Sequence, residues 1–120
     1  MNSKVPGPDN LIRFSQRELD EVIALHERFT VGKKGGARAA LKFLNLSGLN
    51  FRSADLSQAD FTGSILKGAD MSNGTFVTSC FYACDLRNAN LENANFKRAD
   101  FRGAYVAGAN LSGADLDSAD

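Results

Sequence analysis

A large apolar residue recurs at every fifth position from Leu41 to Leu116 without a single insertion, and this period constrains the fold more than any other feature. We call each of these residues the centre of its repeat. The residue two positions before a centre is almost always small, and the residue directly before it is usually Asp or Asn. The consensus is A(D/N)(L/F)xx, as in Ala54-Asp55-Leu56 and Ala99-Asp100-Phe101. Regularity on this scale identifies residues 39–120 as one repetitive domain.

A period of five fits neither a helix nor a flat strand. Five residues of a helix advance by about 140° around its axis, and an odd spacing in a strand sends successive centres to opposite faces. The chain must therefore turn a corner in every repeat. The centre and the small residue before it then point inward, and the other positions face solvent.

These repeats resemble the pentapeptide-repeat family, and the resemblance covers residues 39–120. It implies an all-β solenoid, a right-handed quadrilateral β-helix of about four coils with twenty residues in each coil, spaced by about 4.8 Å. Residues twenty positions apart should then stack, so that Phe side chains follow one another in two columns. The expected structural core includes Phe61, Phe81, Phe101, Phe76, Phe96, Leu66, Leu86 and Leu91.

The segment before the repeats is expected to form a flexible leader (residues 1–14) and then a capping helix with a Gly/Lys linker (residues 15–38). Ser15 and Glu18 have the spacing of a capping box, and an apolar stripe that follows predicts a helix from about Gln16 to Phe29. Glu18-Leu19, His26 and Phe29 are similar to a helix that precedes the first coil in bacterial members of the family.

The two ends of a solenoid expose unpaired backbone groups and an apolar core, so each end is expected to need a cover. The helix is the candidate cover for the first coil, where Phe43, Leu44 and Leu49 are larger than the repeat requires. The other end has no comparable segment before Asp120. Either the chain is a shortened form, or the last coil pairs with another molecule, which makes a homodimer through this coil one expectation.

The residues that could carry chemistry have structural interpretations that we favour. His26 is the only histidine and lies beside the apolar stripe, which indicates a hydrogen-bonded capping side chain rather than a catalytic base. Cys80 points outward, where it is open to oxidation, and Cys84 points inward, so they are not expected to share a metal. The loop from Gly32 to Arg38 lacks a Walker pattern and is interpreted as a helix stop and linker rather than a phosphate site.

The frequent Asp residues occupy the same position as Asn, directly before a centre. We therefore interpret them as short polar side chains that bond to nearby backbone at each corner, and not as acid-base or calcium-binding groups. The sequence predicts no cofactor and no metal, and no enzyme activity.

One stretch departs from the polar exterior of the repeats. Residues 71–84 contain no charged side chain, and similar apolar exposure is expected on an adjoining face. Exposed aromatic residues beside Arg are typical of protein contacts. The predicted interaction surface consists of Val77, Cys80, Tyr82, Ile65 and Tyr105.

Composition limits the class of partner. Lys and Arg balance Asp and Glu at a formal net charge of zero, so neither nucleic acid nor an acidic membrane is an expected partner. No apolar run is long enough to span a membrane. Two cysteines and the lack of an apolar leader favour the cytoplasm.

The sequence therefore favours a non-enzymatic structural or interaction scaffold whose partner is another protein. The alternative that the resemblance implies is a DNA mimic that modulates type II topoisomerase (gyrase). Mimicry needs dense negative charge, and residues 41–120 carry nine acidic and seven basic side chains, so the scaffold is preferred. Inhibition of supercoiling by purified protein would favour the mimic.

Overall fold

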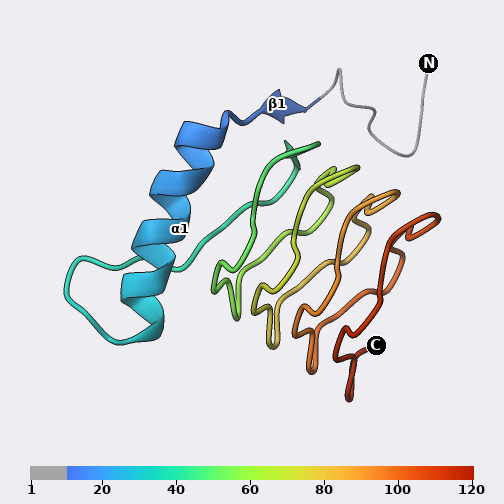
Figure 1. Ribbon diagram of the computed structural model, residues 1–120. Coiled ribbons are helices and arrows are strands. Elements are labelled where there is room, and N and C mark those ends of the chain that lie inside the picture. Colours follow the sequence, from blue (N-terminus) through green and yellow to red (C-terminus); the bar gives the residue numbers. More distant parts are fainter. Residues whose placement is uncertain (1–10) are drawn as a thin grey trace.

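The computed structural model describes residues 11–120, with a short strand β1 (Ile12–Arg13), a helix α1 (Gln16–Thr30) and a second short strand β2 (Leu44–Asn45). The rest of the chain winds through a stack of similar coils (Figure 1). The helix lies beside the first of these coils, and residue 120 lies at the far end of the stack. No helix in residues 11–120 is long and apolar enough to cross a membrane.

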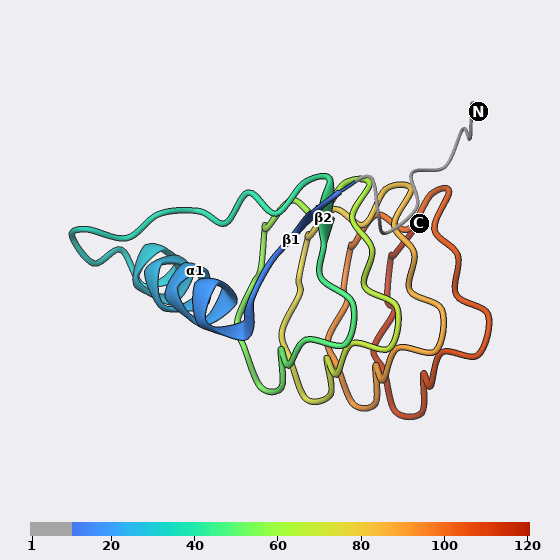
Figure 2. The same ribbon diagram turned by 90° about the horizontal axis from the view of Figure 1, so that it is seen from above.

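Successive coils are joined by parallel bridges between residues twenty positions apart. These bridges run from Ala40 paired with Asp60 to Asn95 paired with Asp115, one in every repeat. The chain therefore returns to the same place after every four repeats, and Figure 2 shows the coils following one another along the stack. Each side is too short to form more than a single bridge, which is why named strands are few although the hydrogen bonding is extensive.

Each corner is made by a left-handed residue two positions after the centre. Gly63 has a φ of 71° there, and Asn73 reaches 59° at the equivalent position. Gly adopts this region without strain, and Asn tolerates it better than most residues. The Asp or Asn before the centre supports the same corner, since Asp60 Oδ1 accepts from Thr62 N at 3.0 Å and Asn95 Oδ1 from Lys97 N at 3.1 Å. The structural interpretation of these Asp and Asn residues is therefore confirmed.

The interior is filled by two columns of stacked Phe rings. In one column the Phe61 and Phe81 ring centroids are 4.7 Å apart and nearly parallel, and the Phe81 and Phe101 centroids are 5.2 Å apart. In the other column Phe76 and Phe96 stack at 5.2 Å. Rings of the two columns meet edge to face, which is one of the arrangements that aromatic pairs prefer. The aliphatic centres Leu66, Leu86 and Leu91 are also fully buried.

Small polar residues enter this interior without being left unpaired. Ser64 Oγ donates to Leu41 O at 2.5 Å, Ser79 Oγ to Leu56 O at 2.7 Å, and Cys84 Sγ to Phe61 O at 2.9 Å. Burial without a partner would cost each group a hydrogen bond. The inward position two residues before a centre thus accepts Ser or Cys in place of Ala because a carbonyl of the preceding coil lies within reach.

The expected burial of the centres, including the core residue Phe101, is wrong for the last coil. Phe101 is only partly buried there, and Val106, Leu111 and Leu116 are exposed, Leu116 to 43%. A centre is covered by the coils on both of its sides, and these residues have a coil on one side only within the described part of the chain.

The region before the repeats differs in part from the prediction. Residues 1–10 of the predicted leader lie outside the described residues, but residues 11–14 are not a loose leader, because β1 pairs in parallel with β2. Helix α1 begins at Gln16 as expected and extends to Thr30, with the Ser15 and Glu18 capping box formed. Phe43 also departs from expectation, since it is 55% exposed and its ring lies close to Gly63 rather than under the helix.

Helix α1 covers the first coil by packing and by hydrogen bonds. Leu19 is fully buried with the centres of the core. Ala39 N donates to His26 Nδ1 at 2.8 Å, so His26 Nε2 carries the proton and donates to Ser57 O at 2.7 Å. The lone histidine is therefore the hydrogen-bonded capping side chain that the sequence predicts, and it joins the helix to both ends of the first coil.

We expect Phe81→Ala to lower the free energy of unfolding by about 3–5 kcal/mol, because it removes the middle ring of a stack and leaves a cavity. Phe43→Ala is the matched control, since it deletes the same side chain from the surface, and it should cost about 1 kcal/mol or less. Urea denaturation measures both. Equal losses would contradict the assignment of Phe81 to the core.

We expect His26→Ala to lower the free energy of unfolding by about 2–4 kcal/mol, because it leaves the amide of Ala39 and the carbonyl of Ser57 unpaired in a buried place. Arg17→Ala, at an exposed position of the same helix, should change it by less than about 0.5 kcal/mol. Thermal and urea unfolding followed by circular dichroism provide the comparison. A neutral effect at His26 would show that the helix does not depend on this contact.

Candidate interaction surfaces

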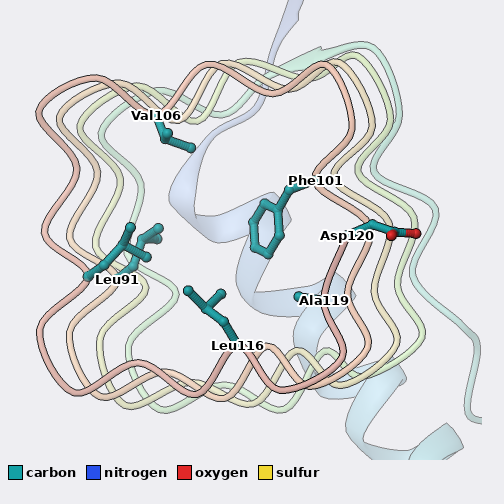
Figure 3. A pocket seen from close by; sticks show the side chains of 7 residues that line it. Leu91, Phe101, Val106, Leu116, Ala119 and Asp120 are labelled. Atoms are coloured by element: carbon teal, nitrogen blue, oxygen red, sulfur yellow. The ribbon is translucent and has the colours of Figure 1, made fainter.

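Two surfaces remain after the structural roles are assigned, and the first is the far end of the coil stack. It forms a hollow of about 250 Å³ that we call the open end, lined by Leu91, Phe101, Val106, Leu111, Leu116, Ala119 and Asp120. Figure 3 views it along the stack, with the side chains of Phe101, Val106 and Leu116 directed inward and the Asp120 side chain directed away. The surface of this end is therefore almost wholly apolar at its centre.

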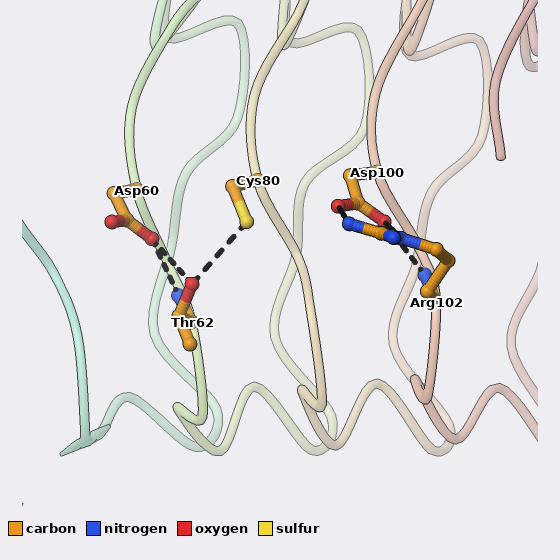
Figure 4. Close-up of polar contacts among 5 residues, drawn as sticks. All are labelled: Asp60, Thr62, Cys80, Asp100 and Arg102. Atoms are coloured by element: carbon orange, nitrogen blue, oxygen red, sulfur yellow. Dashed lines mark hydrogen bonds and ion pairs between the residues drawn. The ribbon is translucent and has the colours of Figure 1, made fainter.

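The second surface lies around Tyr82, and we call it the lateral face and define it by Val77, Cys80, Tyr82 and Arg102. Cys80, Tyr82 and Arg102 belong to one side of the stack, and Val77 directly precedes the corner residue Thr78 that leads to this side. Tyr82 is 47% exposed, and the guanidinium of Arg102 lies 5.7 Å from the centroid of its ring. Arg102 Nη2 also pairs with Asp100 Oδ2 at 2.8 Å (Figure 4). An ordered aromatic ring beside a fixed Arg presents a flat, amphipathic contact area.

Val77 and Cys80 are only partly exposed and contribute less than Tyr82 does. Cys80 lies between Asp60 and Asp100 in successive coils, and its Sγ is 3.2 Å from Thr62 Oγ1 (Figure 4). Cys84 points into the core, where burial raises the pKa of its thiol to about 12. The two cysteines therefore do not converge, and no group of three metal-ligating side chains occurs within residues 11–120.

Ile65 does not belong to either surface, contrary to the sequence prediction. It is 4% exposed and has a coil on each side, where it bridges to Asn45 and to Asp85. Tyr105 continues this column but lies in the last coil, and it is 45% exposed because its far side has no coil over it in the described residues. Position along the stack, and not only register within a repeat, therefore decides exposure.

Asp85, which lies between Ile65 and Tyr105, forms the most enclosed ion pair of the described residues. The Arg87 side chain donates to it twice, from Nε to Oδ1 at 2.9 Å and from Nη2 to Oδ2 at 2.7 Å. These hydrogen bonds from the Arg87 side chain hold the pKa of the Asp85 carboxyl below its usual range, although burial opposes them. The pair fixes the Arg87 guanidinium against the side of the stack.

The loop after α1 agrees with its interpretation as a helix stop and linker. Arg28 Nε donates to Lys34 O at 3.2 Å, and Ala37 N donates to Leu25 O at 3.0 Å, so the loop folds back on the helix that precedes it. Gly36 packs so closely on the backbone of Phe29 that a Cβ there would clash. These contacts hold the loop against the end of the helix.

Lowering the pH should remove the stability that Asp85 contributes. Its pKa in the folded protein lies below that of the unfolded chain, so the contribution is complete above about pH 4 and is lost as the pH falls through the folded value. Asp85→Asn should therefore be less stable than the parent at pH 7, and this difference should shrink at about pH 2. Urea midpoints across this range measure it.

Asp117→Asn is the control for this experiment, because the Asp117 carboxylate accepts no hydrogen bond and makes no ion pair within the described residues. It should leave the pH profile nearly unchanged. If the difference in stability between the parent and Asp85→Asn does not change with pH, the contribution of Asp85 comes from its shape and not from its charge.

Reasoning from the sequence missed two sets of contacts, those that join the helix to the first coil and the one between Arg102 and Tyr82. Gln16 and Glu27 bond to the first coil, and no motif marks them, since each is a polar residue on a helix surface. The pairing of Arg102 with Tyr82 follows from the twenty-residue register, which places Arg102 one coil above Tyr82, so a signal for it was present.

Comparisons with known proteins agree with this geometry. The model of the pentapeptide repeats matches residues 37–76 and 79–120 in eight copies. A pentapeptide repeat protein from the thylakoid lumen of Arabidopsis thaliana is 36% identical, with a TM-score of 0.62 over 62% of this chain and 52% of its own. The chain thus spans about half the length of that relative. A pentapeptide repeat protein from Nostoc PCC 7120 is 23% identical, with a TM-score of 0.63 over 91% of this chain and 78% of its own.

No curated protein sequence matches the chain. The family model nevertheless covers the repetitive region except for residues 77–78, and its five-residue unit is the one that places a bridge in each repeat and a centre in the core. By its sequence and by its fold, this chain belongs to the pentapeptide-repeat family.

Proposed function

We propose that this chain is a right-handed, four-sided solenoid of about four coils that serves as a rigid, non-enzymatic scaffold for binding another protein. The observation that carries the proposal is that the most enclosed of the residues able to perform chemistry already have structural partners. His26 is used by the cap, Cys84 donates to a carbonyl in the core, and Asp60, Asp70 and Asp85 support corners. What remains for function is the surface.

The lateral face is the proposed contact for this partner. Tyr and Arg supply much of the binding energy at protein interfaces, because they offer a large contact area with a polar tip. Here the backbone under Tyr82 is held by hydrogen bonds to neighbouring coils, from Gly63 N to Tyr82 O at 2.9 Å and from Ala83 N to Arg102 O at 2.9 Å. A surface ordered in this way loses little conformational entropy on binding.

The DNA-mimic alternative has no support in the arrangement of charges. On one side of the stack, Lys67 and Arg87 occupy equivalent outward positions in successive coils. On another side, Lys97 Nζ pairs with Asp115 Oδ2 at 3.7 Å. A mimic needs a surface of one sign, with about one negative charge for every 1.7 Å of duplex. The described surface is mixed in sign, and we do not propose this function.

The scaffold proposal predicts that Tyr82→Asp combined with Val77→Asp weakens capture of a protein partner by at least about tenfold, because both changes introduce an unpaired charge into the contact. Immobilised parent and variant are compared by quantitative mass spectrometry of the proteins that each retains. Circular dichroism and Tm of the variant should match those of the parent, since neither side chain is fully buried.

Ser112→Asp is the control for an added negative charge, because it places one Asp at an exposed position of another repeat. It should retain the partner as the parent does. Equal recovery by the parent and by the double variant would remove the lateral face from the proposal.

A further inference from the structure

The two edges of every coil differ in the backbone groups that they present. Along the stack, the centre and the residue two positions after it donate their N–H groups toward the next coil, as in Phe61 N to Cys80 O and Gly63 N to Tyr82 O. Only one carbonyl in each repeat faces the same way, as in Ala59 O, which accepts from Cys80 N. The edge that faces the C-terminal end is therefore rich in donors, and the opposite edge is rich in acceptors.

The acceptor-rich edge of the first coil is covered by donors of the cap. Phe14 N donates to Asn45 O at 3.1 Å, Arg13 Nη1 to Ser47 O at 2.7 Å, and His26 Nε2 to Ser57 O at 2.7 Å. The amide of Gln16 imitates a peptide group, since its Nε2 donates to Asn50 O and its Oε1 accepts from Asn50 N, each at 2.8 Å. The cap thus matches the polarity of the edge as well as its apolar core.

The donor-rich edge of the last coil has no such match within residues 11–120. Its outward N–H groups donate to no described acceptor, and they belong to Gly103, Val106, Gly108, Leu111, Gly113, Leu116 and Ser118. They surround the apolar hollow of the open end, where the rings of the Phe81 column stop at Phe101. Polar groups around such an apolar surface must find partners when the surface is buried.

From this polarity we propose that the open end is a docking surface for the acceptor-rich edge of another pentapeptide coil, in head-to-tail register. Such an edge supplies two carbonyls and one N–H in each repeat, which is the complement of what the open end presents. It also places an apolar centre over each of Phe101, Val106, Leu111 and Leu116. The spacing of 5.2 Å between the Phe81 and Phe101 rings is the distance at which the next centre would rest.

The same polarity opposes a symmetric dimer through this end. Two copies meeting tail to tail would each present two N–H groups for every carbonyl, so that donors would face donors around the ring. Each N–H left unpaired in a dry interface loses its hydrogen bonds to water without replacement. The homodimer expected from the sequence would therefore bury the apolar hollow but leave the N–H groups around it without acceptors.

The test extends the protein after Asp120 by a second copy of its residues 81–100, which places a Phe at the next centre position. The control carries the same twenty residues in scrambled order. Amide hydrogen exchange is measured by NMR at Val106, Leu111 and Leu116 in the parent and in both extended proteins. We expect the ordered coil to slow exchange at these amides at least tenfold and to raise the Tm by about 4 °C or more, and the scrambled extension to do neither.

Two results would overturn the proposal. One is equal protection by the ordered and scrambled extensions, which would mean that any polypeptide shields this end. The other is a parent protein that sediments as a dimer, becomes monomeric on Leu111→Asp, and already protects these amides from exchange. Together these findings would mean that the open end binds the open end of a second copy. Neither result bears on the lateral face, so the scaffold proposal is tested separately.

Discussion

Backbone hydrogen bonding between residues one coil apart is the constraint on which the rest of this structure depends. A side of the coil is so short that it forms only a few hydrogen bonds, and none would be stable alone. Stacking repeats the same bonds from coil to coil and buries the centres in a continuous column, so the structure is held by nearest-neighbour contacts. Corners, caps and surfaces all follow from keeping this register.

Because all coils run in the same direction, the stack has a donor-rich and an acceptor-rich end. A compact domain that buries its core on all sides has no such polarity to satisfy. Here the N-terminal end is matched by a helix whose polar side chains act as backbone substitutes, with His26 and Gln16 each serving as donor and acceptor at once. Charged side chains contribute to the same match, since the Arg13 guanidinium donates to Ser47 O and the Glu27 carboxylate accepts from Asp55 N.

Sequence reasoning was most successful where one position repeats. The centres, the inward small residues and the Asp or Asn that bonds to the corner occur many times, so each is recognised from a pattern rather than from a single residue. The helix was also predictable, because a capping box and an apolar stripe are local signals. The reasoning failed at Ile65, Phe43 and the last centres, where exposure depends on which neighbouring coil lies above or below.

The sequence by itself determined the period and the inward residues, because one pattern recurs at a fixed separation along the chain, and it determined the place of the helix through local signals. The register of twenty came from the resemblance to the family, and the bridges between coils agree with it. Only the tertiary structure decided which residues bridge α1 to the first coil and which way the backbone groups of each edge point. Those features depend on the direction in which the chain closes each coil, and a list of residue types carries no record of that direction.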